Sequence, residues 1–202
     1  MARTPKVVED RRDQIMDAAM RVFAQKGFMK ATNKDIAREA GITPGLIYYY
    51  FESKEALLKA IIEARSPLQL TTSVPPQMFE LPPQAFLRMM LLRVLGIVES
   101  ENFIQLARML FPEIVHNPDM GSITASFLQR AISFLATYFE MQMKKGNLRH
   151  TDASLIAQVL FGCIMGFVLR RQIVHDQVAL QYSHEQIADT ICETVLEGVL
   201  PR

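Results

Sequence analysis

The sequence of 202 residues contains no tryptophan, only two cysteines and only four histidines, and these scarcities exclude several kinds of protein. Cys163 and Cys192 both lie in apolar stretches with helical periodicity, so we expect buried, reduced thiols and no disulfide framework. No two histidines stand four residues apart with an acidic residue in support, which argues against a metal site. Glycine-rich phosphate loops and nucleophile elbows are also missing. We therefore expect neither an enzyme nor a protein that needs a cofactor.

Charge of either sign is nearly balanced, with 22 Lys or Arg, 21 Asp or Glu and a net charge of +1, so no basic field covers the whole chain. The distribution is less even. Residues 1–65 hold twelve Lys or Arg against nine Asp or Glu, whereas the remaining residues hold ten against twelve. This asymmetry fits a protein with one nucleic-acid-binding end. Residues 1–13 are polar and charged, so we expect no signal peptide and a cytoplasmic protein.

Apolar residues recur every three or four positions along most of the chain, and no segment alternates with the period of a β-strand. The first helical pattern covers about residues 7–26. A proline-rich run from Pro67 to Pro83 predicts a loop or a broken helix and separates the N-terminal part from a longer body. The body predicts helices over 83–100, 102–116 with an interruption at Pro112, 118–145, 152–175 and 184–199. The expected fold is therefore all-α, with domains at 1–65 and 66–202.

The residues between Thr32 and Ser53 contain start and stop signals for three helices. Thr32 and Asp35 have the spacing of a capping box, and Gly41 is suited to end that helix in the left-handed conformation. Thr43–Pro44 then combines a capping hydroxyl with a proline at the first helical position. Ser53 caps a third helix. A helix, a short turn and a second helix form the layout of a DNA-binding helix-turn-helix, whose second helix enters the major groove.

The second helix of this motif carries three consecutive tyrosines, and so many exposed aromatic side chains need a partner. A phenol can bond a phosphate or a base edge, and its ring can contact a thymine methyl group. Lys54, at the start of the next helix, could bind a phosphate together with backbone N–H groups. The alternative is that the tyrosines pack inside an ordinary three-helix bundle. Of the three, Tyr48 is the one that we expect to be half-buried.

The segment from Ile36 to Leu57 reads I-A-x-x-A-G-I-T-P-G-x-I-Y-Y-Y-F-x-S-K-E-x-L and resembles the N-terminal domain of the TetR (tetracycline-repressor) family of bacterial transcriptional regulators. The resemblance implies a three-helix helix-turn-helix domain followed by a larger helical ligand-binding and dimerisation domain. It also implies phosphate or base contacts from Thr32, Asn33, Lys34, Thr43, Gly45, Leu46, Tyr48, Tyr49, Tyr50 and Lys54. Pro44 and Leu46 stand where many relatives have polar residues, so we expect few direct hydrogen bonds to base edges.

The stretch from Ala153 to Leu169 has no charged residue. With 17 residues it is at the short limit for a membrane span, and it includes two polar side chains, so we expect a protein without a membrane segment. Gly162 and Gly166 stand four apart and would let a second helix approach closely. The last helix offers another apolar stripe at Ile187, Ile191 and Val195. We predict a homodimer through 152–175 and 184–199.

Methionine and phenylalanine are abundant between residues 78 and 167, and such adaptable apolar side chains can line a cavity for an apolar ligand. At helical spacing they fit an ordinary core as well. The candidate pocket residues are Phe86, Met90, Arg93, Phe103, Met109, Phe127, Phe134, Tyr138 and Met165. With the family resemblance, we expect a repressor that an apolar or amphipathic small molecule releases from a double-stranded DNA operator. The alternative is a DNA-binding regulator without a small-molecule ligand, controlled by its abundance or by a protein partner.

Overall fold

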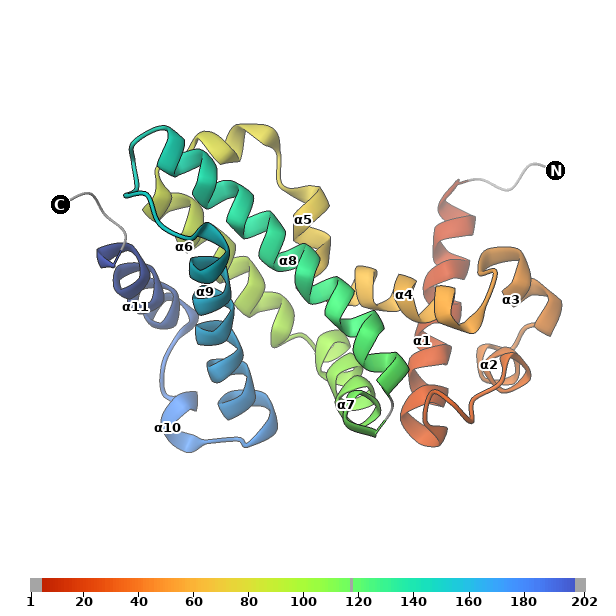
Figure 1. Ribbon diagram of the computed structural model, residues 1–202. Coiled ribbons are helices and arrows are strands. Elements are labelled where there is room, and N and C mark those ends of the chain that lie inside the picture. Colours follow the sequence, from red (N-terminus) through yellow and green to blue (C-terminus); the bar gives the residue numbers. More distant parts are fainter. Residues whose placement is uncertain (1–4, 117, 199–202) are drawn as a thin grey trace. The chain divides into compact units, whose positions relative to one another are not determined.

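The computed structural model describes residues 5–116 and 118–198, which form helices and connecting turns and contain no strand (Figure 1). The prediction of an all-α fold is confirmed. The chain forms two compact units. The first comprises the residues up to Ser66 together with Glu101–Gly121, and the second comprises Pro67–Ser100 and the residues from Ser122 onwards.

Five helices belong to the first unit: α1 (Pro5–Lys26), α2 (Asn33–Ala40), α3 (Pro44–Tyr50), α4 (Lys54–Arg65) and α7 (Glu101–His116). Helix α1 contacts α2, α4 and α7, and is therefore the common support of the unit. Its Ile15 and Phe23 are fully buried, as are Leu58 and Ile61 of α4. A domain this small buries little apolar surface, so the side chains of α4 are needed to complete its core.

Helix α7 runs without a break through Pro112, so the predicted interruption at this proline is wrong. A proline inside a helix removes one backbone hydrogen bond and crowds the preceding turn. Leu106 and Met109 are buried in the turns that precede Pro112, and this packing helps to hold the helix where the bond is missing. Because α7 groups with the first unit, the two compact units are not consecutive in sequence. The assignment of domains to 1–65 and 66–202 stays a prediction.

The second unit contains η1 (Pro67–Gln69), α5 (Leu70–Ser73), η2 (Pro76–Glu80), α6 (Pro83–Val98), most of α8 (Pro118–Lys144), α9 (Ala153–Val168), the π-helix η3 (Leu169–Ile173), α10 (Gln177–Leu180) and α11 (His184–Glu197). The proline-rich run thus forms short helical turns, as expected of a broken helix. Helix α11 contacts α6 and α9.

A cluster of ion pairs joins the end of α6 to the segment between α9 and α11. Arg171 donates a hydrogen bond to Glu99, and its Nη1 donates to the carbonyl oxygens of Ala179 at 2.8 Å and Tyr182 at 2.7 Å. His184 Nε2 lies 2.8 Å from the other oxygen of Glu99. Burial raises the pKa of the Glu99 carboxyl, but the hydrogen bonds from Arg171 and His184 outweigh burial and leave this pKa below its usual value. Glu99 is thus held as a carboxylate that fixes the start of α11.

Candidate nucleic-acid interface

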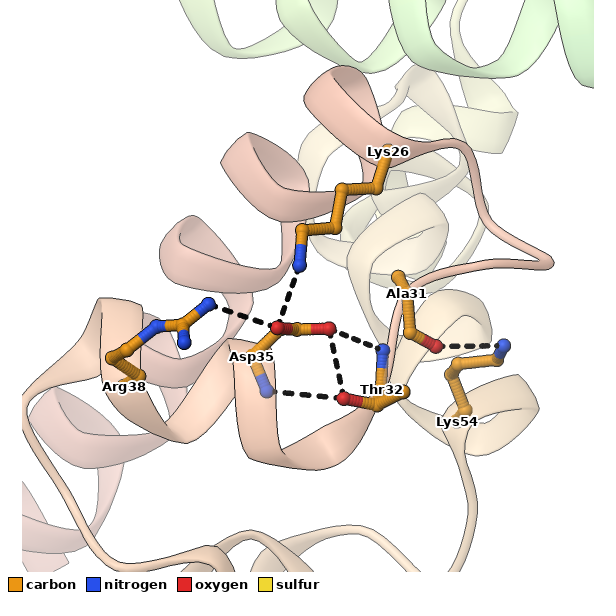
Figure 2. Close-up of polar contacts among 6 residues, drawn as sticks. All are labelled: Lys26, Ala31, Thr32, Asp35, Arg38 and Lys54. Carbon is orange, nitrogen blue, oxygen red and sulfur yellow. Dashed lines mark hydrogen bonds and ion pairs between the residues drawn. The ribbon is translucent and has the colours of Figure 1, made fainter.

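Helix α2 begins at the predicted capping box, which Figure 2 shows in full. Thr32 Oγ1 accepts the backbone N–H of Asp35 at 3.2 Å, and Asp35 Oδ2 accepts the backbone N–H of Thr32 at 3.2 Å. The helix ends at Gly41, whose φ of 64° is the left-handed conformation that glycine adopts without strain. Ile36, Ala37 and Ala40 are its buried residues. The sequence signals at both ends of α2 are therefore confirmed.

Asp35 also connects α2 to the end of α1. Its Oδ1 accepts hydrogen bonds from Lys26 Nζ at 2.6 Å and from Arg38 Nη2 at 2.9 Å (Figure 2). The hydrogen bond from Lys26, followed by that from Thr32, lowers the pKa of Asp35 from 3.8 to about 2. The carboxylate is therefore charged over the whole physiological range and can serve as a fixed anchor for the N-terminal end of α2.

Helix α3 begins differently from the prediction. Thr43 occupies the N-cap position, but its side chain makes no capping hydrogen bond. The prediction that its hydroxyl caps the helix is therefore wrong. Pro44 supplies a φ already suited to a helix, and the N–H of Leu46 donates to the Thr43 carbonyl at 3.0 Å. Ile47 and Phe51 are buried, as their spacing predicts, so α3 is held by one apolar face.

Two of the three tyrosines of α3 extend into solvent. Tyr48 is 60% exposed and Tyr49 is 71% exposed. Tyr50 is the half-buried member, with its hydroxyl buried and without a partner, so the assignment of that role to Tyr48 is wrong. The side chains of Tyr48 and Tyr50 flank the inward face on opposite sides, so helical periodicity alone could not distinguish them. The exposed face of α3 consequently presents Tyr48 and Tyr49.

Polar side chains of α1 hold the C-terminal ends of both short helices. Gln14 Nε2 donates to the carbonyl of Ala40, the last residue of α2, at 2.8 Å. Arg12 Nη1 donates to the carbonyl of Tyr50, the last residue of α3, at 3.3 Å, and its guanidinium carbon lies 4.6 Å from the centre of the Phe51 ring. The last carbonyls of a helix have no partner within the helix, so these contacts stabilise its end. Neither role could be predicted from the sequence, because no local pattern connects Gln14 and Arg12 to helix ends 26 and 38 residues away.

The other predicted contacts lie at the starts of α2 and α3. Thr32, Lys34, Thr43 and Gly45 are exposed, whereas Asn33 and Leu46 are partly buried. The first N–H groups of α2 have no partner further back in the helix, and the helix dipole makes this end favourable for anions. Exposed hydroxyl and ammonium groups therefore lie at the starts of α2 and α3, two helices that contact each other, in the same unit as the exposed tyrosines.

Lys54 is placed differently from the other predicted contacts. Its ammonium donates to three backbone carbonyls of the loop between α1 and α2: Phe28 at 2.7 Å, Met29 at 3.3 Å and Ala31 at 3.1 Å. It also lies 4.5 Å from the centre of the Phe28 ring, within the range of a cation–π contact. Its donors are thus directed at the chain itself.

In the second unit, an aromatic cluster brings together three of the predicted pocket residues, Phe86, Phe134 and Tyr138. The Phe86 and Tyr138 rings stack at 3.8 Å between centres, and Phe79, which sequence analysis did not select, meets Phe134 edge to face at 5.6 Å. The Tyr138 hydroxyl donates to the Leu81 carbonyl at 3.2 Å. Burial raises the pKa of Tyr138, so its phenol is neutral at physiological pH.

The remaining candidate pocket residues are distributed over both units. Met90 and Phe127 are buried, Met165 is partly buried and Arg93 is exposed, all in the second unit. Phe103 and Met109 lie on α7, in the first unit. The structure therefore brings only part of the predicted set into one cluster.

The residues predicted to form a dimer interface differ in accessibility. Gly162 and Gly166 are exposed on α9, on the same face as the exposed side chains of Leu155, Val159 and Leu169.

By length and composition alone, the helical stretch Ala153–Ile173 is apolar enough to cross a membrane. Core helices of soluble proteins also meet this criterion.

Ile187, Ile191 and Val195 are buried inside the chain itself, so the prediction that these side chains form part of a dimer interface is corrected. Their helix, α11, packs against α6 and α9 of the same chain. The apolar stripe was recognised correctly, but its partner is internal.

The fold and the α2–α3 pair define a helix-turn-helix protein, and the proteins that it resembles are transcriptional regulators and not enzymes. Residues 15–61 match the family described as bacterial regulatory proteins, tetR family, and residues 85–197 match the AefR-like transcriptional repressor C-terminal domain. The chain belongs to the TetR family of bacterial transcriptional regulators.

Individual relatives agree with this assignment. The regulator HbdR of Aromatoleum sp. (strain CIB) is 48% identical over 54 residues, which are 27% of this chain and 24% of HbdR, so the match spans about a quarter of that relative. Among solved structures, the SmeT–triclosan complex has a TM-score of 0.75 at 19% identity and covers 95% of this chain and 92% of SmeT. FadR of Bacillus subtilis with stearoyl-CoA has a TM-score of 0.69 at 21% identity, over 92% of this chain and 98% of FadR. At such identities the structures support the fold alone.

The depressed pKa of Asp35 predicts a pH dependence of stability. Because the folded state lowers this pKa from 3.8 to about 2, the stabilisation from the carboxylate is complete above about pH 4 and is lost as the pH falls towards 2. Asp35→Asn should therefore lower the melting temperature at pH 7, and the gap to the wild type should close between about pH 4 and pH 2. Asp10→Asn, at an exposed acid of α1, is the control and should change little. A gap that stays constant over this pH range would contradict the role given to Asp35.

Proposed function

We propose that this protein is a homodimeric repressor that binds a double-stranded DNA operator through α3 and is released from it by an apolar or amphipathic small molecule. Regulators of the TetR family bind DNA operators and act as dimers. The observation that carries the proposal is the exposed pair Tyr48 and Tyr49, on a helix whose opposite face and C-terminal end are held by the rest of the unit.

A DNA-reading role explains why α3 exposes so much aromatic surface. Exposed apolar area of this kind is unfavourable in water unless a partner covers it. The second helix of a helix-turn-helix enters the major groove, where phenol groups can bond phosphates and base edges and rings can contact thymine methyl groups. At Gly45 an added Cβ would meet no atom within 4 Å, so the start of α3 is open to a close backbone approach. Thr32, Asn33, Lys34, Thr43, Leu46 and Tyr50 complete the proposed DNA-contacting set.

Tyr49→Ala tests the contribution of this face. Loss of a phenol in the groove should weaken binding by about 1–3 kcal/mol, or roughly 5- to 150-fold, without changing the melting temperature. The measurement is a titration of a duplex that the purified protein selects from a random-sequence library. Tyr182→Ala, at another exposed tyrosine in the second unit, is the matched control and should bind normally. If Tyr48→Ala and Tyr49→Ala both bind DNA with wild-type affinity, the proposal that α3 enters the major groove is contradicted.

We place the proposed dimer interface on α9. Leu155 and Val159 are 58% and 59% exposed, and Gly162 and Gly166 continue the same face without side chains. A symmetric dimer would cover this apolar surface and would present one copy of α3 to each DNA half-site. The same arrangement accounts for an apolar α9 in a soluble regulator.

Gly166→Arg should prevent this association. A Cβ at Gly166 meets no atom of the chain within 4 Å, so the substitution is tolerated in the fold, but a long charged side chain would occupy the close-packed face. Sedimentation should therefore show monomers. Gly96→Arg, at an exposed glycine of α6 with equally open surroundings, should remain dimeric. A dimer that survives Gly166→Arg would move the interface elsewhere.

The proposed effector site is centred on the aromatic cluster of Phe79, Phe86, Phe134 and Tyr138, with Met90, Phe127 and Met165 as further apolar candidates. An apolar site needs a few polar groups to orient a ligand, and Gln142, whose Nε2 lies 3.3 Å from the Phe79 carbonyl, is a buried one. Triclosan in the SmeT complex and stearoyl-CoA in the FadR complex are apolar or amphipathic, which supports this ligand class for a protein of the same fold.

Helix α7 offers a physical connection to the DNA-binding residues. It contacts both α1 and α4, and Glu113 Oε1 accepts the backbone N–H of Phe28 at 2.7 Å. A Cβ at Gly27 would lie only 2.8 Å from the same oxygen, so α7 is held close to the loop that leads into α2. A displacement of α7 would therefore disturb the loop that leads into α2. The coupling cannot exceed the difference in ligand affinity between the two states, typically about 1–3 kcal/mol.

A melting-temperature screen distinguishes this proposal from a regulator without a small-molecule ligand. A compound present at about one hundred times its dissociation constant should add about 2.7 kcal/mol to the free energy of unfolding and raise the melting temperature. The panel should contain apolar and amphipathic compounds, including triclosan and long-chain acyl-CoA. A true effector should also weaken DNA binding at the same concentration. A panel without such a compound would favour control by abundance or by a protein partner.

A further inference from the structure

We infer that the ring of Phe79 occupies the place of an effector's aromatic ring, and that residues 76–81, which we call the strap, move aside to admit this ligand. The inference rests on the proposed effector site at the aromatic cluster and deepens it. It names the class of ligand, an aromatic compound that carries a hydrogen-bond acceptor oxygen, and it identifies the part of the site that opens.

Phe79 differs from the other three members of the aromatic cluster in the element that carries it. Phe86 lies on α6, and Phe134 and Tyr138 lie on α8, whereas Phe79 lies on η2, a 3₁₀-helix of five residues. Its ring nevertheless contacts the other three, with centres 5.6 Å from Phe86, 5.6 Å from Phe134 and 6.3 Å from Tyr138. An aromatic ring of a ligand could make the same edge and tilted contacts.

The strap is held by polar contacts from α8 more than by burial. None of the five residues of η2 is fully buried. Gln142 Nε2 donates to the Phe79 carbonyl at 3.3 Å, and the Tyr138 hydroxyl donates to the Leu81 carbonyl at 3.2 Å. Each such bond adds little net stability, because water replaces the lost partner when the segment opens. Short segments with few buried contacts are those that open locally while the rest of the fold stays intact.

The ends of the strap are stiffer than its attachment. Prolines occupy positions 75–76 and 82–83, on either side of its central residues, and their fixed φ favours movement of the segment as one piece. Lys145 of α8 also pairs with Glu80, whose side chain is 71% exposed, so solvent weakens this contact. The rings on α6 and α8 would therefore stay in place while Phe79 leaves.

Displacement of the strap would free two hydrogen-bond donors beside the remaining rings. The Tyr138 hydroxyl and the Gln142 amide would both lose a carbonyl partner. The amide keeps its orientation, since its Oε1 accepts from Asn147 Nδ2 at 2.6 Å and its NH₂ group faces the strap. A buried donor without a partner is unfavourable, so the ligand should supply an acceptor oxygen, as a ketone, an ester or an ether does.

Calorimetric titration with propyl benzoate, an aromatic ring with an ester group, tests the site. The wild-type protein must first displace the Phe79 ring, so Phe79→Ala should bind this probe about tenfold more tightly. Phe111→Ala, at an exposed phenylalanine of α7, is the control and should bind like the wild type. Equal or weaker binding by Phe79→Ala, at a temperature where circular dichroism shows it folded, would overturn the inference.

Movement of the strap can be followed directly, because the sequence contains no tryptophan. Phe79→Trp introduces a single indole, and saturation with propyl benzoate should shift its emission to longer wavelength as the indole enters water. Tyr182→Trp, at an exposed tyrosine of the same unit, should keep its emission. Binding of the probe without a red shift in Phe79→Trp would contradict displacement of the strap.

The ligand class is tested with pentylbenzene, which matches propyl benzoate in ring and chain length but has no acceptor. Tyr138→Phe should reduce the affinity for the ester relative to the hydrocarbon by about two- to tenfold. Loosening of the strap affects both compounds alike, so this ratio isolates the hydrogen bond. Lys144→Met, at an exposed lysine of α8, should leave the ratio unchanged. An unchanged ratio in both Tyr138→Phe and Gln142→Met would overturn the assigned class.

Failure of the proposed function would give a different result. If no compound of the melting-temperature panel weakens DNA binding, control of the operator by an effector is contradicted. Tighter binding of propyl benzoate by Phe79→Ala would in that case still support the aromatic site.

Discussion

The structure depends on one constraint: α2 and α3 have 8 and 7 residues, too few to be stable as isolated helices. Their end groups must therefore be satisfied from outside. Gln14 and Arg12 of α1 bond the last carbonyls of the two helices, and the Asp35–Lys26 pair fixes the start of α2. With α2 held at both ends and α3 at its C-terminal end, α3 buries Ile47 and exposes two tyrosines. The exposed face of α3, with Tyr48 and Tyr49, therefore depends on these contacts from the rest of the unit.

Local sequence signals predicted most of the first unit because each acts over a few residues. The capping box at Thr32, the left-handed Gly41 and the inward spacing of Ile47 and Phe51 were all predictable. The errors occurred where two positions were equivalent by periodicity, as for the tyrosines, or where the contact spans a long loop. The hydrogen bonds of Lys54 could not be predicted for the second reason. Its carbonyl partners lie 23 to 26 residues away, and no spacing rule connects them.

In the second unit the sequence predicted apolar stripes but could not assign their partners. The stripe of α11 could pack against its own chain or a second copy, and burial of Ile191 against its own chain corrects the original assignment. The stripe of α9 is divided: Ala157 and Leu160 are buried, while Leu155 and Val159 remain exposed. Phe79 joined the aromatic cluster unforeseen because it lies in a proline-rich run, where helical periodicity gives no guidance.

The central claim is that a symmetric pair of chains presents α3 twice to one face of duplex DNA. Hydroxyl-radical footprinting on the selected duplex tests it most directly. The account predicts two protected patches related by a two-fold axis, with their centres about one helical turn, or a multiple of it, apart on the same face. A single protected patch, or two patches on opposite faces of the duplex, would contradict it.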